Sequence, residues 1–452
     1  MLQRYLPHYR QTVHLAYPIV LGQISHILIT VADNTMIGNF SSLALAAATF
    51  ANALFAIIMM LGIAGTWVIT PLVAKAKAEG DELECRKWLY HSLLVFPTLS
   101  VVFCTAVVIL SFFADHFGQS PEVVAMAVPY VQVLAISLIF IIIFQVFKQF
   151  MDGLGETQEP MLINFAAAAL NVVFNYMLIF GNWGFPAMGV LGGGIASLLA
   201  RIFAALAIAW RFFTLPKFQP YVAQLHAVAY VRYYAVKLLK LGIPVGFQSV
   251  FEVSAFAFAT IMVGWLGATE LAAHQIALNI ATITFMIASG ISAAATIRVA
   301  QQFGQKKRRE LLQAGFAAYH LVIAFMGMCA VAIALLRYWL PTFYVQPNDP
   351  EAVRMMSVSA QLLIYAALFQ VSDGAQVVGM GVLRGIQDIK APTIIAFVAY
   401  WVLGLPIGYV LGFTFHLGVN GIWLGLALAL TFAAIFLGSR FFNKGQQIKM
   451  TT

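Results

Sequence analysis

The sequence predicts an all-α polytopic membrane protein with twelve transmembrane helices, and three observations indicate this fold class. First, 62% of the 452 residues are apolar and only 9% are charged, whereas an ordinary soluble domain has about 45–50% apolar and about 25% charged residues. Second, a helix needs about 20 apolar residues to span a bilayer, and the chain divides into twelve such runs. Third, basic residues collect in alternate connections between the runs. A soluble globular protein, a disordered chain and a disulfide scaffold are therefore excluded.

The twelve expected spans are apolar runs bounded by charged residues, proline and glycine. In chain order they are 13–38, 43–70, 88–113, 123–150, 159–181, 188–213, 238–266, 271–299, 311–338, 354–382, 390–413 and 417–441. We expect the first run to be a true span and not a cleaved signal peptide. It is long, contains Asp33, lacks a clear small-residue cleavage site and is followed by eleven further spans.

The basic residues predict how the chain is oriented in the membrane. Twenty-two of the 25 lie at the termini or in the connections after spans 2, 4, 6, 8 and 10; the exceptions are Arg201, Arg337 and Arg354. Because cytoplasmic loops are enriched in lysine and arginine, both termini and the even-numbered connections are expected in the cytoplasm. The net charge of +8 then reflects topology and contact with lipid headgroups, and no nucleic-acid partner is expected.

The sequence repeats itself with an offset of 226 residues. The stretch 35–54 aligns with 261–280 through a shared pattern of methionine, glycine, leucine and alanine, and Pro18 aligns with Pro244. Collinear matches of this kind indicate two six-span halves. Since six is even, both halves insert with the same orientation, so their pseudo-two-fold axis is expected along the membrane normal. The expected organisation is an N-terminal lobe at 1–213, a cytoplasmic linker at 214–237 and a C-terminal lobe at 238–452.

Three carboxylates lie in the middle of expected spans: Asp33 in span 1, Glu252 in span 7 and Asp373 in span 10. A charged carboxylate at the bilayer centre costs roughly 2.5–3.5 kcal/mol on insertion scales. Such residues commonly face a water-filled cavity, bind a cation or take part in proton transfer. The alternative is a purely structural hydrogen bond or ion pair between helices. We expect these three residues to take part in cation coupling and substrate binding.

Asn171 and Asn175 in span 5 are four residues apart, so their side chains share one helix face. Two amide oxygens together with the Asp33 carboxylate make a set of hard oxygen ligands suited to a small cation, and we expect a sodium site at these three residues. Hydrogen bonding between helices is the alternative explanation for the asparagines. Arg201 lies within span 6, and the sequence assigns it no role.

Several kinds of chemistry are missing from the sequence. There is no Walker A loop, no HExxH and no GxSxG elbow, and the three cysteines have no ligand spacing. We therefore expect a transporter that needs no cofactor and is not an enzyme. A channel and an intramembrane enzyme that uses carboxylates remain the alternatives from other classes.

Six segments together resemble the multidrug and toxic compound extrusion (MATE) family, most closely its NorM-type branch. VADNTMIG contains Asp33 and is similar to the family's first-helix aspartate motif; FEVSAFAFA contains Glu252 at the NorM-type span-7 position. One departure is Phe369, where some NorM-type members have a tyrosine one turn before the span-10 aspartate. The other segments are LNVVFNYMLIFG with Asn171 and Asn175, ELAAHQIALN, SDGAQVVGMGVLRGIQDIKAP with Asp373, and MDGLGETQEP.

The resemblance implies a multidrug antiporter in the cytoplasmic membrane of a bacterium. Such a protein exports cationic amphipathic small molecules in exchange for sodium ions or protons by alternating access, and sodium is our expectation here. We expect the protein to be a monomer. The nearest rival is a lipid-linked oligosaccharide flippase of the same superfamily. A flippase is expected to need cationic side chains for an anionic headgroup, whereas the excess of intramembrane charge in this sequence is acidic.

Overall fold

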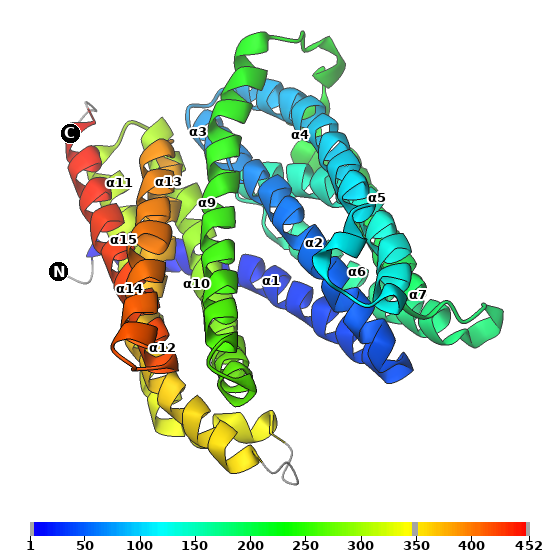
Figure 1. The fold of residues 1–452 in the computed structure, drawn as a ribbon. Coiled ribbons are helices and arrows are strands. Elements are labelled where there is room, and N and C mark those ends of the chain that lie inside the picture. Colours follow the sequence, from blue (N-terminus) through cyan, green and yellow to red (C-terminus); the bar gives the residue numbers. More distant parts are fainter. Residues whose placement is uncertain (1–3, 346–350, 449–452) are drawn as a thin grey trace. The chain divides into compact units, whose positions relative to one another are not determined.

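The computed structural model describes residues 4–345 and 351–448, and these residues form helices joined by short connections, without strands (Figure 1). Twelve helical segments among them are long and apolar enough to cross a membrane. The expected fold class is confirmed: this is an all-α, multi-pass membrane protein. Each expected span overlaps one observed helical segment; the largest differences are at the second, which extends to Ala78 instead of residue 70, and at the first, which begins at Leu6 instead of residue 13. At both places the helix continues through polar residues that lie next to the apolar run.

The long helices of the first half are α1 (Leu6–Phe40), α2 (Ser42–Thr66) with α3 (Ile69–Ala78), α4 (Glu82–Ser111), α5 (Pro121–Gly153), α6 (Gln158–Phe180) and α7 (Gly189–Thr214). Those of the second half are α9 (Arg232–Gly264), α10 (Ala268–Gly304), α11 (Arg308–Leu336), α12 (Ala352–Gly385), α13 (Lys390–Phe397) with α14 (Leu405–Tyr409), and α15 (Val419–Gln447). The short elements are α8 (Gln219–Val222) and 3₁₀ turns at Ala114–Phe117, Asn182–Gly184, Pro216–Phe218, Leu225–Ala227 and Leu340–Phe343.

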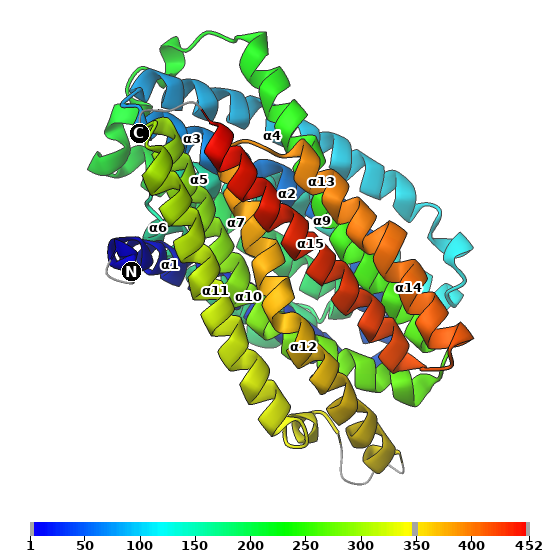
Figure 2. The same ribbon diagram turned by 90° about the vertical axis from the view of Figure 1, so that its left-hand side faces the viewer.

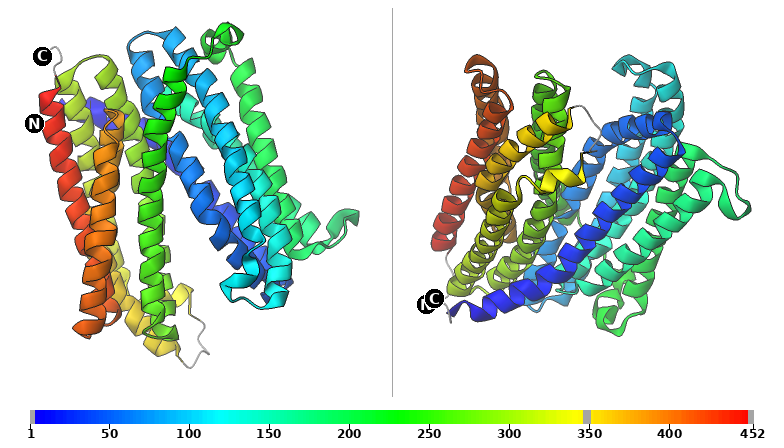
Figure 3. Two further views of the ribbon diagram at one scale, coloured as in Figure 1. Left: turned by 45° about the horizontal axis from the view of Figure 1, so that its top comes forward. Right: turned by 90° about the horizontal axis from the view of Figure 1, so that it is seen from below.

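The chain forms two compact units. The N-unit is Leu21–Gly246, and the C-unit is Met1–Val20 together with Phe247–Thr452. In the N-unit α5 contacts α2, α4 and α7, and α7 also packs on α6 (Figure 3). In the C-unit α12 contacts α10, α11 and α15 (Figure 2). The unit boundaries fall inside α1 and α9, whereas the sequence places lobe boundaries at 213 and 238; those lobe boundaries stay a prediction.

Close backbone contacts and aromatic packing explain why the start of α9 belongs to the N-unit. A Cβ atom on Gly242 would lie 2.8 Å from the carbonyl oxygen of Gly65, and one on Gly246 would lie 2.8 Å from that of Leu61. Small residues allow membrane helices to approach this closely. Two turns before Gly242 in the same helix, the Tyr234 ring packs edge-on against Trp88 with a centroid distance of 4.6 Å.

The start of α1 is attached to the C-unit by polar contacts. His8 Nε2 lies 3.2 Å from Glu310 Oε2 on α11, and the Tyr9 hydroxyl lies 2.9 Å from His320 Nδ1 on the same helix. The helix is continuous across Val20 and Leu21, where the C-unit ends and the N-unit begins, and Asp33 lies in its N-unit part. Both α1 and α9 therefore run from one unit into the other.

Each unit contains a bidentate ion pair between an arginine and a carboxylate, at corresponding places in the two halves. In the N-unit Arg211 donates two hydrogen bonds to the Glu159 carboxylate, at 3.0 and 3.1 Å. In the C-unit Arg440 donates two to the Asp388 carboxylate, at 2.7 and 3.1 Å. Both arginines are near the end of the last helix of their half, and the bidentate pair attaches that helix to the chain at or just before the start of the fifth span.

The connection between the halves packs on the N-unit. Lys217 pairs with Glu156 at 2.7 Å and with Glu159 at 3.4 Å. Burial lowers the pKa of Lys217, but the hydrogen bonds and negative charges of the two glutamates raise it by more, so this pKa lies above its ordinary value. The lysine therefore stays charged and attaches the connection to the N-unit.

The eleventh span is the most irregular of the twelve. Between and after its two α-helical parts it contains π-helical segments at Val398–Gly404 and Val410–Thr414. Pro406 lies between these segments and has no backbone N–H to donate. π-Helical turns change the direction in which side chains project, and they are frequent at functional sites. Tyr400 lies in the first of these segments and is therefore a candidate functional residue.

Candidate functional site

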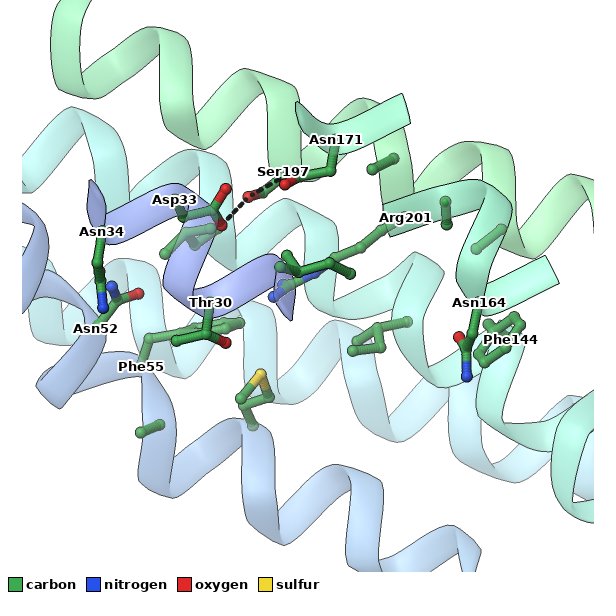
Figure 4. Close-up of a pocket in the computed structure, with 18 of the residues that line it drawn as sticks. Thr30, Asp33, Asn34, Asn52, Phe55, Phe144, Asn164, Asn171, Ser197 and Arg201 are labelled. Atoms are coloured by element: carbon green, nitrogen blue, oxygen red, sulfur yellow. Dashed lines mark hydrogen bonds between the residues drawn. The ribbon is translucent and has the colours of Figure 1, made fainter. Parts of the chain in front are cut away.

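The N-unit brings together one carboxylate and three neutral polar side chains. Asp33 on α1 accepts hydrogen bonds from Asn175 Nδ2 on α6 and from Ser197 Oγ on α7, the second at 3.2 Å. Asn175 Nδ2 also lies 3.3 Å from Asn171 Oδ1, and Asn171 Nδ2 lies 3.4 Å from Ser197 Oγ. These four residues form a closed hydrogen-bond network that joins three helices; Figure 4 shows three of them, Asp33, Asn171 and Ser197. We call them the Asp33 network.

The structure therefore places Asp33, Asn171 and Asn175 at one location, as their sequence pattern suggested, and their use as an ion site stays a prediction. Both asparagines are fully buried, and Asn175 Oδ1 has no hydrogen-bond partner among the residues that the structure describes. An unpartnered buried carbonyl oxygen is energetically unfavourable. It is also a vacant acceptor beside a carboxylate, and such an oxygen can ligate a hard cation.

The Asp33 network lies at the wall of a cavity of about 350 Å³ in the N-unit. The cavity has apolar and aromatic walls with a few polar groups, the usual character of a site for small molecules. Its aromatic side chains are Phe55, Tyr130 and Phe144. Besides Asp33, Asn171 and Ser197, its polar lining residues are Thr30, Asn34, Thr49, Asn52, Gln145, Asn164 and Arg201 (Figure 4).

Sequence reasoning missed Ser197 and gave no role to Arg201. The structure shows both on the cavity side of α7, one helical turn apart. The signal for Ser197 was its i,i+4 spacing from Arg201, because that spacing puts the two side chains on one face. A serine in a span rich in glycine and alanine is too common to stand out without this reasoning.

In the C-unit a second carboxylate has its own partners. The Tyr400 hydroxyl, on the π-helical segment of span 11, lies 3.4 Å from Glu252 Oε1 on α9. The next residue, Trp401, donates to the carbonyl oxygen of Phe251 at 3.1 Å. Two consecutive residues of span 11 therefore contact two consecutive residues of α9.

Asp373 on α12 is buried and interacts electrostatically with Glu252, which also interacts with Arg384. Tyr400 interacts electrostatically with both carboxylates. The structure thus brings Glu252 and Asp373 to one region of the C-unit. Phe369, which replaces the tyrosine of some similar proteins, stacks on Trp423 at a centroid distance of 5.4 Å and supplies no oxygen.

Among the described residues, no group of three or more histidine, cysteine, aspartate or glutamate side chains is arranged to hold a metal ion. A transition-metal site requires such a cluster. A weakly held alkali cation bound by one carboxylate and neutral oxygens does not, so this observation leaves the expected sodium site untested.

The fold and the two polar sites define a class: a multi-pass helical membrane transporter built from two homologous halves. The family model MatE matches residues 18–177 and again residues 244–410. The two matches begin 226 residues apart, so the predicted internal repeat is confirmed, with the expected offset at its start. The chain therefore belongs to the MatE family. Because this is a transporter family, the expectation of a transporter and not an enzyme is confirmed.

Whole-chain relatives agree with this membership. The probable multidrug resistance protein NorM of Pseudomonas putida is 33% identical, over 94% of this chain and 92% of the relative. The protein of the same name in Rhizobium meliloti is 30% identical, over 96% and 93%. A solved outward-facing structure of a multidrug resistance MATE family transporter of the MOP superfamily has a TM-score of 0.87, at 20% identity, over 97% of this chain and 96% of that one. The structural likeness supports the fold.

Proposed function

We propose that this protein is a secondary active multidrug efflux antiporter that exports organic cations in exchange for sodium ions or protons by alternating access. The names of the relatives above support the multidrug part of this proposal. The distribution of lysine and arginine supports a cytoplasmic location for both termini. We place the protein in the bacterial cytoplasmic membrane, as a monomer that needs no cofactor.

A single observation supports the exchange mechanism best: the Asp33 carboxylate lies at the wall of a cavity with aromatic sides. A carboxylate in a low-dielectric surrounding attracts any cation that reaches it. Aromatic faces attract organic cations as well. The coupling ion and the charged group of the drug therefore compete for one negative charge, and each displaces the other. The direction of transport follows from the ion gradient.

Sodium fits the Asp33 network better than a proton does. A proton needs one carboxylate, whereas sodium needs several oxygen ligands. Asp33, Asn171 and the unpartnered Asn175 Oδ1 supply them. In the alternative, the asparagines only orient Asp33 through the hydrogen bonds described above while it takes up a proton.

Proteoliposomes loaded with ethidium test both parts of the proposal. One sample receives a sodium gradient opposite to efflux at fixed pH, and another receives a proton gradient without sodium. We expect sodium to drive efflux, and Asn175→Ala to weaken the response to sodium. Efflux that responds only to the proton gradient, and is unchanged in Asn175→Ala, contradicts sodium coupling but leaves antiport intact.

A parallel substrate comparison tests the rival. Transport of a lipid-linked sugar by the same vesicles, without efflux of any organic cation, would assign a flippase function and overturn the proposed one. Asp33→Asn is the control in both assays, because its amide keeps the size of the side chain but removes the negative charge.

A further inference from the structure

Arg201 is the second charged side chain of the N-unit cavity. It belongs to α7, is half-buried, and lines the cavity one turn beyond Ser197 (Figure 4). Its Nη1 donates a hydrogen bond of 2.6 Å to Ser137 Oγ, and its guanidinium carbon lies 5.5 Å from the centre of the Phe55 ring. Neutral groups therefore hold the guanidinium in place, and its charge acts on Asp33 through space.

The formal charge of the cavity follows from its lining. Among the lining residues of the part of the chain that the structure describes, Asp33 is the one acidic side chain and Arg201 is the one basic side chain. The empty cavity is therefore neutral overall. One bound monovalent cation makes its net charge +1, and a second positive charge makes it +2.

We propose that Arg201 is a charge-selecting residue that limits this cavity to one positive charge at a time. This inference deepens the proposed function and rests on it. Excess charge is strongly unfavourable in a cavity with apolar walls, because the attraction or repulsion between charges is larger there than in water. Without Arg201 the empty cavity has a net charge of −1, and a second positive charge brings it only to +1.

Two consequences follow for ligands. A monocation binds better than a dication of the same size and shape, because the second charge of the dication is repelled by Arg201 and has no carboxylate of its own. For the same reason, a sodium ion and a monocationic drug exclude each other even where the cavity has room for both. Arg201 thereby enforces the exchange that antiport requires.

A matched pair of rigid probes tests the first consequence. The 1-methyl-4-phenylpyridinium cation and the 1,1′-dimethyl-4,4′-bipyridinium dication have nearly the same shape and differ by one charge. Binding of each to the purified full-length protein is measured by displacement of ethidium. We expect the wild type to bind the monocation at least about tenfold more tightly than the dication, and Arg201→Met to reduce this ratio by about tenfold.

Arg201→Lys is the matched control, because it keeps the charge and changes the shape of the side chain. It is expected to keep the preference of the wild type. Arg201→Gln is the second uncharged variant, since its amide can still donate to Ser137 if Arg201→Met folds poorly. A preference that is unchanged in both uncharged variants, or that is lost equally in Arg201→Lys, overturns the inference while leaving the proposed function intact. A wild type that binds neither probe overturns the proposed function itself.

Competition with sodium tests the second consequence. In the wild type the apparent dissociation constant of ethidium is expected to rise in proportion to the sodium concentration. In Arg201→Met the rise is expected to level off, because both cations then bind together. A rise that continues without limit in Arg201→Met, to the same extent as in the wild type, contradicts the role of Arg201 in mutual exclusion.

Discussion

The N-unit and the C-unit share the same contacts between helices, but their polar sites differ. In both, a glycine of the last long helix lies against the backbone of the preceding span: Gly192 against Leu178, and Gly421 against Leu411 and Gly412. In both, an arginine of that last helix forms a bidentate ion pair with a carboxylate, as described above for Arg211 and Arg440.

The functional carboxylates, in contrast, do not occupy equivalent positions. At the 226-residue offset Asp33 corresponds to Ala259, and Glu252 corresponds to His26. The fifth span of each half still supplies a partner for the carboxylate of the first span, an asparagine in one case and Tyr400 in the other. The comparison teaches that the repeat preserves backbone packing, while the ionisable groups have diverged between the halves.

The largest expected effect tests the N-unit site. Asp33→Asn should reduce ethidium efflux by at least about a hundredfold, because removing the carboxylate removes the charge for which ion and drug compete. The amide is easier to bury than a carboxylate, so insertion and folding should be kept. Efflux by vesicles with matched amounts of protein measures this, and size-exclusion profiles serve as the folding control. Wild-type efflux in this variant would show that the N-unit cavity is not the exchange site.

The next prediction asks whether the C-unit carboxylates are functional as well. Glu252→Gln and Asp373→Asn should each lower the efflux rate by about tenfold, and the double variant by little more, because the two groups interact and act as a unit. The same vesicle assay applies. Normal efflux in all three variants would show that the C-unit carboxylates have a structural role only. Transport would then depend on the carboxylate of the N-unit alone.

A pair of glycine substitutions tests the helix packing that the two units share. Gly192→Ala and Gly421→Ala should each destabilise the protein by about 1–3 kcal/mol, because the added methyl group overlaps backbone atoms that cannot move aside. Thermal unfolding of the purified variants gives the measurement, and Gly327→Ala is the control, since a Cβ there meets nothing within 4 Å. If only one of the two variants is destabilised, the halves do not rely on the same packing.

The smallest expected effect concerns the partner of Glu252. Tyr400→Phe removes one hydroxyl and should slow efflux by about two- to threefold, since a hydrogen bond of 3.4 Å is long and contributes at the lower end of the usual range of about 0.5–1.5 kcal/mol. Because the hydroxyl donates its hydrogen bond to Glu252, most of the change should disappear in a Glu252→Gln background. Trp401→Phe, which removes the neighbouring bond to Phe251, is the control for a merely structural effect. Additive losses in the double variant would show that Tyr400 acts independently of Glu252.

The twelve spans could be predicted from the sequence because a helix that crosses a bilayer must be long and apolar and must satisfy its own backbone hydrogen bonds. Long apolar runs of this kind are easy to recognise in a single sequence. The grouping of Asn171 with Asn175 was readable for a similar reason, since helical geometry fixes the neighbours at i and i+4. Pairing of these residues with Asp33 was an inference that the structure bears out geometrically, as the network of hydrogen bonds shows. Tyr400 could not be found this way, because its partner lies on a helix distant in sequence. The signal for Ser197 was its spacing from Arg201, a residue to which the sequence assigned no role.

The sequence by itself determined the membrane class, the twelve spans, the 226-residue repeat and the family. The first two depend on composition and local periodicity, and the last two depend on similarity between segments of sequence. None of the four needs knowledge of which helices touch. Only the tertiary structure decided that Arg201 shares a cavity with Asp33, and that α1 and α9 each belong to two units. The physical reason is that packing between helices depends on shape at close contact, as at Gly65 and Gly242, and such contacts have no period along the chain.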